Sequence, residues 1–279
     1  MNRQRRLAAC SAWRRLERGR FFDIVPSVKH SRGFILAIDG PAGSGKSTTA
    51  RLCAERLGFR HLDTGAMYRA VALKVLRTST DIRDEHGVAR MLRATRVGVD
   101  WQPAGMRVKL DGRDVSEDIR APEVSGFVSE VSAVPAVRKK MVAEQRRVAE
   151  GQAVVCEGRD IGSVVFPDAD LKIFIECDAV ERARRRQLEL AEQGVRTGQK
   201  AVLANLVKRD RIDSGREVSP LRRMPDAVLL DTTHMTIEEQ TLIVCDLVRR
   251  GCGLKSRARS QKPKDKAAER GRSEVSRCG

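Results

Sequence analysis

The feature that most constrains the fold of this chain is an apolar strand that runs into a glycine-rich loop and then a helix. Residues 40–47 fit the pattern G-x-x-x-x-G-K-[ST], with Gly40, Gly45, Lys46 and Ser47 at its fixed positions. Before the loop, FILAI favours a buried strand, and after it TTARLCAERL favours a helix. In this strand–loop–helix context the pattern predicts a phosphate-binding loop rather than a flexible glycine loop.

The loop also indicates a class of ligand. Its glycines let backbone N–H groups close around an anion, and the positive end of the following helix points to the same place. Lys46 can reach the terminal phosphates of a nucleoside triphosphate, and Ser47 can hold Mg²⁺. The predicted ligands are therefore ATP and Mg²⁺, with Ser47 as the metal ligand. The predicted ATP-binding residues are Gly40, Pro41, Ala42, Gly43, Ser44, Gly45, Lys46, Ser47 and Thr48.

Along the chain, strand and helix patterns alternate. The strand candidates are residues 34–39, 59–62, 153–157, 171–176 and 227–231. Helical patterns separate them, which predicts an α/β fold with a five-stranded parallel sheet and helices on both faces. Residues 96–116 break the rhythm, because polar and apolar residues alternate there around an Asp-Gly turn. This stretch predicts a small antiparallel insert.

The basic residues concentrate at the two ends of the chain. Of the net charge of +17, residues 1–32 carry +7 and residues 249–279 carry +8, so that residues 33–248 carry only +2. We expect both ends to be disordered extensions, because a charged tail has little apolar surface to bury. The first could instead be a targeting segment or an over-long reading frame, and both could contact nucleic acid weakly.

Composition places the chain among soluble proteins of a reducing compartment. It is 41% hydrophobic and 33% charged, and no run of about 18 apolar residues occurs that could span a membrane. Its seven cysteines are scattered without a C-x-x-C pair, which argues against a zinc site and a disulfide framework. We expect a cytoplasmic monomer.

Polar residues follow two of the predicted strands. Residues 63–69 (DTGAMYR) follow the second strand and residues 157–162 (EGRDIG) end the third. Ligands of open parallel sheets bind beyond the carboxyl ends of strands, so we expect these residues at the cleft rather than in an isolated ion pair. Arginine clusters at 181–186 and 208–216 flank a lid-like segment, and there we favour clamps on phosphoryl charge over a solvated face.

Taken together, residues 33–248 resemble bacterial cytidylate kinases, which are P-loop nucleoside monophosphate kinases. The resemblance rests on IDGPAGSGKS, LDTGAMYR, the insert ending in DGRDVS, GRDIGSVVFPDA, ERA and RDRIDS, in family order. It implies transfer of a phosphoryl group from ATP to CMP or dCMP, with a monophosphate-binding domain that contains the insert and a helical lid over about residues 181–216. Glu157 stands where an aspartate is common in the family and keeps the negative charge. Thr64 stands where a serine is common and keeps the hydroxyl group.

The resemblance also implies roles for single residues. Asp160, Ser129 and Arg138 match positions that read cytosine, whose N4 amine donates while N3 and O2 accept. Thr64, Tyr68, Arg69 and Arg159 match the monophosphate side, and Arg209 with Asp213 matches the pair that meets the sugar hydroxyls. We predict that the catalytic residues, which neutralise the negative charge of the transferring phosphoryl group, are Lys46, Arg159, Arg185 and Arg216.

Two other classes remain as alternatives at this stage. Another P-loop kinase, such as an adenylate or shikimate kinase, would share the loop and the sheet, although the insert and the Gly-Arg-Asp sequence argue against it. A P-loop switch or nucleic-acid-binding protein would fit the loop and the charge. A GTPase, however, should carry N-K-x-D for guanine, and the sequence lacks it.

Overall fold

A computed structural model of the chain describes residues 33–103, 105–192 and 194–260, with side chains up to residue 251. The predicted extension over residues 1–32 lies outside the described residues, as do residues 261–279 of the predicted C-terminal tail. The helix α9 (Ile237–Ser260) continues past residue 248, where we placed the end of the kinase domain. The first part of the segment expected to be disordered is therefore helical.

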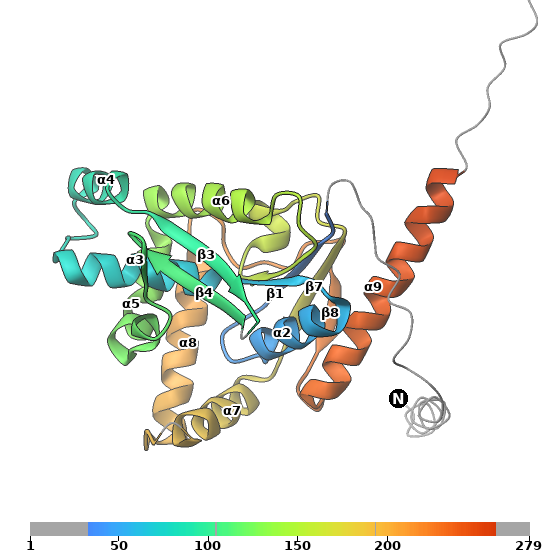
Figure 1. Cartoon of the computed structure of the whole chain (residues 1–279). Helices are drawn as coiled ribbons and strands as arrows, with labels where there is room; N and C mark the ends of the chain where they lie inside the picture. Colours follow the sequence, from blue (N-terminus) through green and yellow to red (C-terminus); the bar gives the residue numbers. More distant parts are fainter. Residues whose placement is uncertain (1–32, 104, 193, 261–279) are drawn as a thin grey trace, which may run out of the picture. The chain divides into compact units, whose positions relative to one another are not determined.

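The core is a five-stranded parallel sheet in the order β2-β6-β1-β7-β8 (Figure 1). The strands are β1 (Ile35–Asp39), β2 (Arg60–Asp63), β6 (Val154–Gly158), β7 (Leu171–Glu176) and β8 (Val228–Asp231). All five predicted strands are confirmed to within one residue at each end. The signal was strong because β1 and β6 are buried almost throughout, and so read as unbroken apolar runs.

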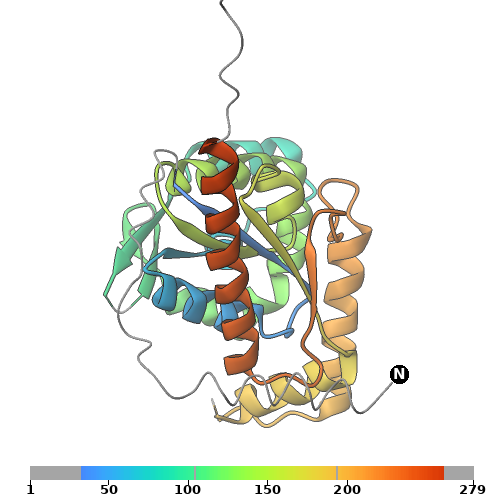
Figure 2. The same cartoon turned by 90° about the vertical axis from the view of Figure 1, so that its right-hand side faces the viewer.

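Helices cover both faces of the sheet, as predicted. Successive side chains of β1 alternate between the faces, so that Leu36 and Ile38 pack with α2 and α9, whereas Ala37 packs with α3, α5 and α6. Figures 1 and 2 show α9 along the outer side of the sheet next to α2. The helix bounds are α2 (Lys46–Leu57), α3 (Thr64–Thr78), α4 (Glu85–Arg93), α5 (Pro122–Ala133), α6 (Pro135–Ala149), α7 (Ala179–Glu192) and α8 (Gln199–Gly215).

The insert predicted over residues 96–116 is confirmed as a small antiparallel sheet. It consists of β3 (Val97–Gln102), β4 (Gly105–Leu110) and β5 (Arg113–Asp114). Asp111 and Gly112 join β4 to β5 with positive φ angles of 53° and 86°, which is the geometry that an Asp-Gly hairpin turn requires. Val108 and Leu110 are buried in the same cluster as the residues of α3, so the insert packs on the α3 side of the sheet.

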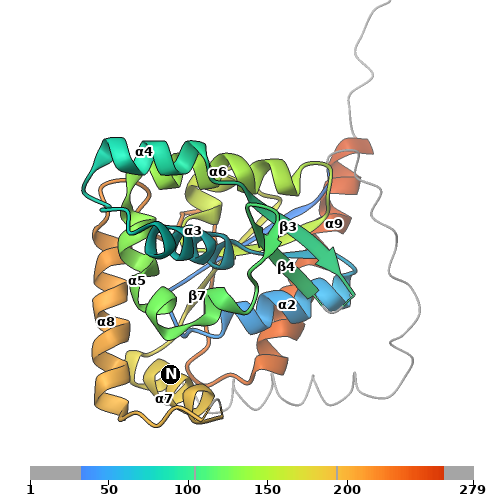
Figure 3. The ribbon, with the colours of Figure 1, turned by 60° about the vertical axis from the view of Figure 1, so that its left-hand side comes forward.

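The segment predicted as a helical lid forms two helices, α7 and α8, and α7 lies across the lower end of α8 (Figure 3). Ala183, Val202 and Leu206 form a small separate apolar cluster with Ala42 of the phosphate loop. The lid therefore rests directly on the loop that follows β1. Two short turns complete the described elements, η1 (Asp118–Arg120) and the π-helical turn η2 (Ile161–Val165). Within the described part of the chain, no helix is both long enough and apolar enough to cross a membrane.

Candidate active site

The loop between β1 and α2 has the backbone geometry of an anion cradle. Gly45 caps the start of α2 with a φ of 85°, a left-handed conformation that side chains other than glycine adopt at a cost. A Cβ atom at Gly40 would lie 2.4 Å from the carbonyl oxygen of Ile175, so β7 leaves room only for glycine there. The first N–H groups of α2 have no intrahelical partner and face the loop.

Lys46 lies within this loop and is only 6% exposed. Its Nζ donates to the carbonyl oxygen of Pro41 at 3.1 Å, which places the ammonium group along the curve of the loop. Burial, together with the positive charge of Arg159, lowers the pKa of Lys46 to about 7. The site is therefore short of negative charge, which an anionic ligand would supply.

Ser47 and Glu157 meet at the carboxyl edge of the sheet. The Ser47 hydroxyl donates to Glu157 Oε2 at 2.6 Å, and Glu157 Oε1 lies 3.0 Å from His61 Nε2. Burial alone would lower the pKa of His61, but the hydrogen bond and charge of Glu157 outweigh it and hold the pKa above its usual value. Sequence reasoning did not select His61, because it lies 96 residues from its partner.

Asp39 is a second buried acid that the sequence did not single out as a site residue. Its two carboxylate oxygens accept the N–H groups of Ile161 and Gly162, each at 2.8 Å. Burial raises the pKa of Asp39 to about 6, against the lowering effect of these two bonds. Asp39 thereby fixes the turn η2, which begins directly after the predicted site residues Arg159 and Asp160.

The three residues expected to read the base lie close together. The guanidinium group of Arg138 pairs with the Asp160 carboxylate, and their side chains are 2% and 5% exposed. Arg138 also donates to the carbonyl oxygen of Ser132 at 3.1 Å and lies over the ring of Tyr68, 5.5 Å from its centroid. Ser129 is also buried and lies one helical turn before Ser132, whose hydroxyl donates to the Ser129 carbonyl oxygen at 3.0 Å.

The predicted monophosphate side is held by hydrogen bonds at the start of α3. Asp63 caps this helix by accepting the Ala66 N–H at 2.9 Å, and its other oxygen pairs with Arg69 at 3.0 Å. Burial raises the pKa of Asp63, but the charges of Arg69, His61 and Lys46 and the Ala66 N–H together outweigh it, so the pKa lies below its usual value. The Thr64 hydroxyl donates to the carbonyl oxygen of Glu157 at 2.7 Å, which ties α3 to β6.

Arg159, Arg209, Asp213 and Arg216 gather where the lid faces the sheet. Arg159 Nε donates to Asp213 Oδ2 at 2.8 Å, and an Arg216 nitrogen lies 3.9 Å from Asp213 Oδ1. One carboxylate thus faces three guanidinium groups. Burial and the charge of Arg159 lower the pKa of Arg209 to about 10. Within the described residues, Nε of Arg209 and both Nε and Nη2 of Arg216 are buried without a hydrogen-bond partner.

Two arginines of α7 attach the lid to its surroundings, one to the phosphate loop and the other to the segment after β8. Arg182, which sequence analysis placed only in an arginine cluster, donates to the Ala42 carbonyl oxygen at 3.0 Å and to Asp210 Oδ2 at 2.6 Å. Arg185, a predicted catalytic residue, is held by Glu181 at 2.9 Å and by the Thr232 carbonyl oxygen at 2.7 Å. Its remaining nitrogen, Nη1, is buried without a partner among the described residues. That nitrogen lies 3.8 Å from where a Cβ at Gly45 would be, so it faces the loop.

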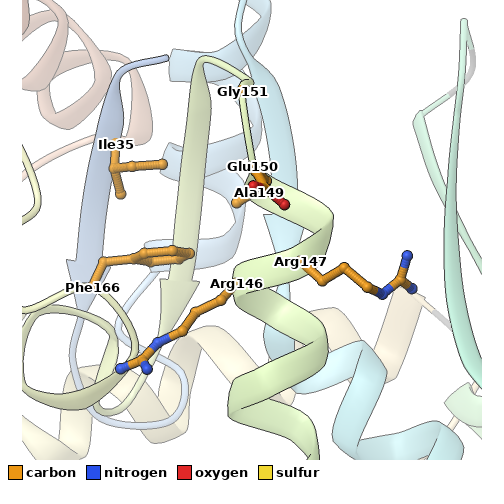
Figure 4. Close-up of a pocket in the computed structure, with 7 residues that line it drawn as sticks. All are labelled: Ile35, Arg146, Arg147, Ala149, Glu150, Gly151 and Phe166. Carbon is orange, nitrogen blue, oxygen red and sulfur yellow. The ribbon is translucent and has the colours of Figure 1, made fainter. Parts of the chain in front are cut away.

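A pocket of about 390 Å³ lies away from these residues (Figure 4). It is lined by Ile35, Arg146, Arg147, Ala149, Glu150, Gly151 and Phe166. Ile35 begins β1, whereas the phosphate loop follows the other end of that strand. Arg146 already donates to the carbonyl oxygens of Val164 and Val165, at 2.7 and 2.8 Å. The pocket therefore lies at the amino edge of the sheet and is separate from the site.

Comparison with known proteins identifies the family of the chain. The model of the family "Cytidylate kinase" matches residues 36–250. A cytidylate kinase of Caldanaerobacter subterraneus subsp. tengcongensis is 49% identical over 215 residues, covering 77% of this chain and 94% of that protein. One from Mycolicibacterium paratuberculosis is 49% identical over 220 residues, covering 78% and 96%. A solved gluconokinase from Sinorhizobium meliloti has 14% identity and a TM-score of 0.40 over 82% and 99% of the two chains, which is too remote to bear on function. The chain belongs to the cytidylate kinase family.

Proposed function

We propose that this chain transfers the γ-phosphoryl group of ATP to CMP or dCMP, giving ADP and CDP or dCDP. The observation that carries the proposal is a set of buried guanidinium N–H groups on Arg185, Arg209 and Arg216, near the phosphate loop and the Arg138–Asp160 pair, that have no hydrogen-bond partner in the described part of the chain. Unpaired cationic donors at such a position call for a strongly anionic ligand. Two nucleotides that meet phosphate to phosphate supply that charge.

Cytosine would be read by the Asp160–Arg138 pair together with Ser129. An ionised Asp160 accepts from the N4 amine of cytosine, whereas arginine and serine donate to N3 and O2. Uracil presents an acceptor at C4, so the carboxylate would face an oxygen without a proton between them. Leaving such a buried group unpaired costs about 1–3 kcal/mol, which would favour CMP over UMP.

The reaction is an in-line displacement without a covalent intermediate. An oxygen of the CMP phosphate forms a bond to the γ-phosphorus while the bond to the β-phosphate oxygen breaks and ADP leaves. Because the acceptor oxygen is already anionic, no general base is required. Lys46, Arg159, Arg185 and Arg216 would neutralise the charge on the transferring group, and closure of the lid would exclude water.

The donor atoms at Ser47 and Glu157 fit a Mg²⁺ site. A hydroxyl and a carboxylate oxygen 2.6 Å apart beside the phosphate loop are hard oxygen ligands, which Mg²⁺ prefers. Among the described residues no three His, Cys, Asp or Glu side chains form a metal-binding group, and Mg²⁺ in kinases needs only one or two protein ligands besides phosphates. When bound, Mg²⁺ would offset charge on the β- and γ-phosphates.

We also place the enzyme in the cytoplasm. The four cysteines whose side chains the structure describes, Cys53, Cys156, Cys177 and Cys245, are all buried free thiols. Free thiols of this kind are typical of a reducing compartment.

The proposed activity is tested by comparing phosphoryl acceptors. The full-length protein with ATP and Mg²⁺ is assayed for ADP release with CMP, dCMP, UMP, AMP and shikimate at equal concentrations. We expect the highest kcat/KM with CMP or dCMP. Faster turnover of AMP or shikimate than of CMP would show that the chain is a different P-loop kinase.

A further inference from the structure

We infer that His61 is a positioning residue for Glu157: it holds one carboxylate oxygen so that the other faces Ser47 and the metal. This inference rests on the proposed function, because that function supplies the metal. It adds a residue that neither the sequence motifs nor the family comparison points to.

The two oxygens of Glu157 have different partners. Oε1 lies 3.0 Å from His61 Nε2, and Oε2 accepts the Ser47 hydroxyl at 2.6 Å. A carboxylate held on both oxygens cannot rotate about its last bond without breaking one contact. The Glu157 side chain is only 3% exposed and that of His61 is 18% exposed, so water competes little for either contact.

The register of the sheet explains why these side chains meet. β2 pairs in parallel with β6, with His61 opposite Val155 and Asp63 opposite Glu157. Side chains two residues apart on a strand point to the same face. His61 and Glu157 are therefore diagonal neighbours on the face that carries α2, whose second residue is Ser47.

A glutamate needs such a restraint if it is to hold a metal in one place. Its three side-chain torsions must be fixed, which costs rotamer freedom. The imidazole supplies part of this restraint in advance, because His61 is itself held. Its carbonyl oxygen accepts Nε1–H of Trp101 in the insert at 2.9 Å, and the neighbouring Arg60 guanidinium lies 5.5 Å from the centroid of the Trp101 ring.

The alternative is a purely structural role, in which His61 only supplies a hydrogen-bond partner to the buried Glu157 carboxylate. In that case the loss of His61 would lower stability and leave metal affinity unchanged in the folded protein. A positioning role predicts the opposite pattern, because partners behind a metal ligand typically change metal affinity by about 10–100-fold. The two roles are therefore distinguished by metal binding rather than by activity.

The experiment measures Mn²⁺ binding to the full-length protein in the presence of ADP, followed by the electron paramagnetic resonance signal of free Mn²⁺. His61→Phe keeps a flat ring without a donor, and we expect Mn²⁺ affinity to fall about tenfold or more. His61→Gln places an amide nitrogen near the position of Nε2, so affinity should return to within about twofold of wild type. His61→Asn is too short to reach Glu157 and should behave like His61→Phe.

The matched control is Arg51→Gln, on the same helix as Ser47, which loses an exposed ion pair with Glu55 and leaves the contacts of His61 and Glu157 in place. It should leave Mn²⁺ affinity unchanged, and thermal unfolding of every variant shows which of them fold. The inference is overturned if His61→Phe or His61→Asn binds Mn²⁺ as tightly as wild type, or if His61→Gln loses as much affinity as His61→Asn. If His61→Phe does not fold, the Gln and Asn variants decide.

Wild-type phosphorylation of CMP is measured on the same preparation. Absence of transfer to CMP would refute the proposed function, while the comparison of Mn²⁺ affinities would still test the role of His61. A normal rate with CMP, combined with unchanged Mn²⁺ affinity in the Phe and Asn variants, would refute the positioning role alone.

Discussion

Asp160→Asn should invert the preference of the site for its base, because Arg138 determines which way the new amide faces. The Arg138 guanidinium donates to Oδ2 of Asp160, and both side chains are at most 5% exposed. In the variant the amide oxygen must take that position, since guanidinium N–H groups only donate. The amide nitrogen then stands in the place of Oδ1 and presents a donor to the base.

The size of the effect follows from the bonds that change. With CMP, a hydrogen bond from N4 to a carboxylate, worth about 1.5–3 kcal/mol, is replaced by two opposed donors. This predicts a loss of about 10- to 150-fold in kcat/KM. With UMP, the amide can donate to the C4 oxygen, which relieves about 1–3 kcal/mol. The ratio of kcat/KM for CMP to that for UMP should therefore fall about 70-fold or more.

The assay is steady-state ADP release with CMP and UMP, alongside urea unfolding of each protein. Weakening a buried ion pair should also lower the free energy of unfolding, so rates are compared only where the variant is folded. The control is Asp226→Asn, which breaks an ion pair of 2.7 Å with Lys172 away from the base site. An unchanged CMP-to-UMP ratio in folded Asp160→Asn would refute the assignment of cytosine recognition to this pair.

Three further predictions concern buried charges. The pKa of Asp39 is about 6 in the folded protein, against 3.8 for an ordinary aspartate such as that of the unfolded chain. Protonated Asp39 therefore adds to the free energy of unfolding at low pH, and this contribution is lost as the pH rises from 4 to 6. Urea unfolding should show about 3 kcal/mol of that loss in wild type and none of it in Asp39→Asn. Lys46→Met should lower the rate of phosphoryl transfer by about 100-fold or more, because it removes a positive charge beside the transferring group. It should also raise the melting temperature, because a buried ammonium group is removed. A lower melting temperature would contradict this. In Arg182→Lys, one ammonium group cannot reach Cys177, Ala42 and Asp210 together, as the guanidinium group does. The substitution should therefore lower the free energy of unfolding by about 1–3 kcal/mol. It should also raise KM for ATP more than KM for CMP. Equal effects on both KM values would argue against an anchor at the phosphate loop.

Most of the fold could be predicted because it depends on local pattern. The strands of the parallel sheet are short buried apolar runs, and the Asp-Gly turn of the insert has a backbone requirement that few other dipeptides meet. The end of α9 was not predictable in the same way. Its last turns carry the lysines and arginines of the tail, whose composition resembles that of a disordered segment.

Contacts between distant residues could not be predicted. Asp39 accepts from residues more than 120 positions away, and Glu157 meets His61 across 96 positions. Nothing in the local sequence of either acid indicates which distant residue it contacts. Arg182 and Asp210 come together only because α7 and α8 pack on each other next to the phosphate loop.

The sequence by itself determined the phosphate loop, the order of the strands along the chain and the position of the insert, because each depends on residues within about 20 positions of one another. Through its motifs it also identified the family. Only the tertiary structure decided which groups of the site hold one another: Asp39 with the turn after β6, His61 with Glu157, and Arg138 with Asp160. These pairs depend on strand register and helix packing, which bring together side chains that no local pattern relates.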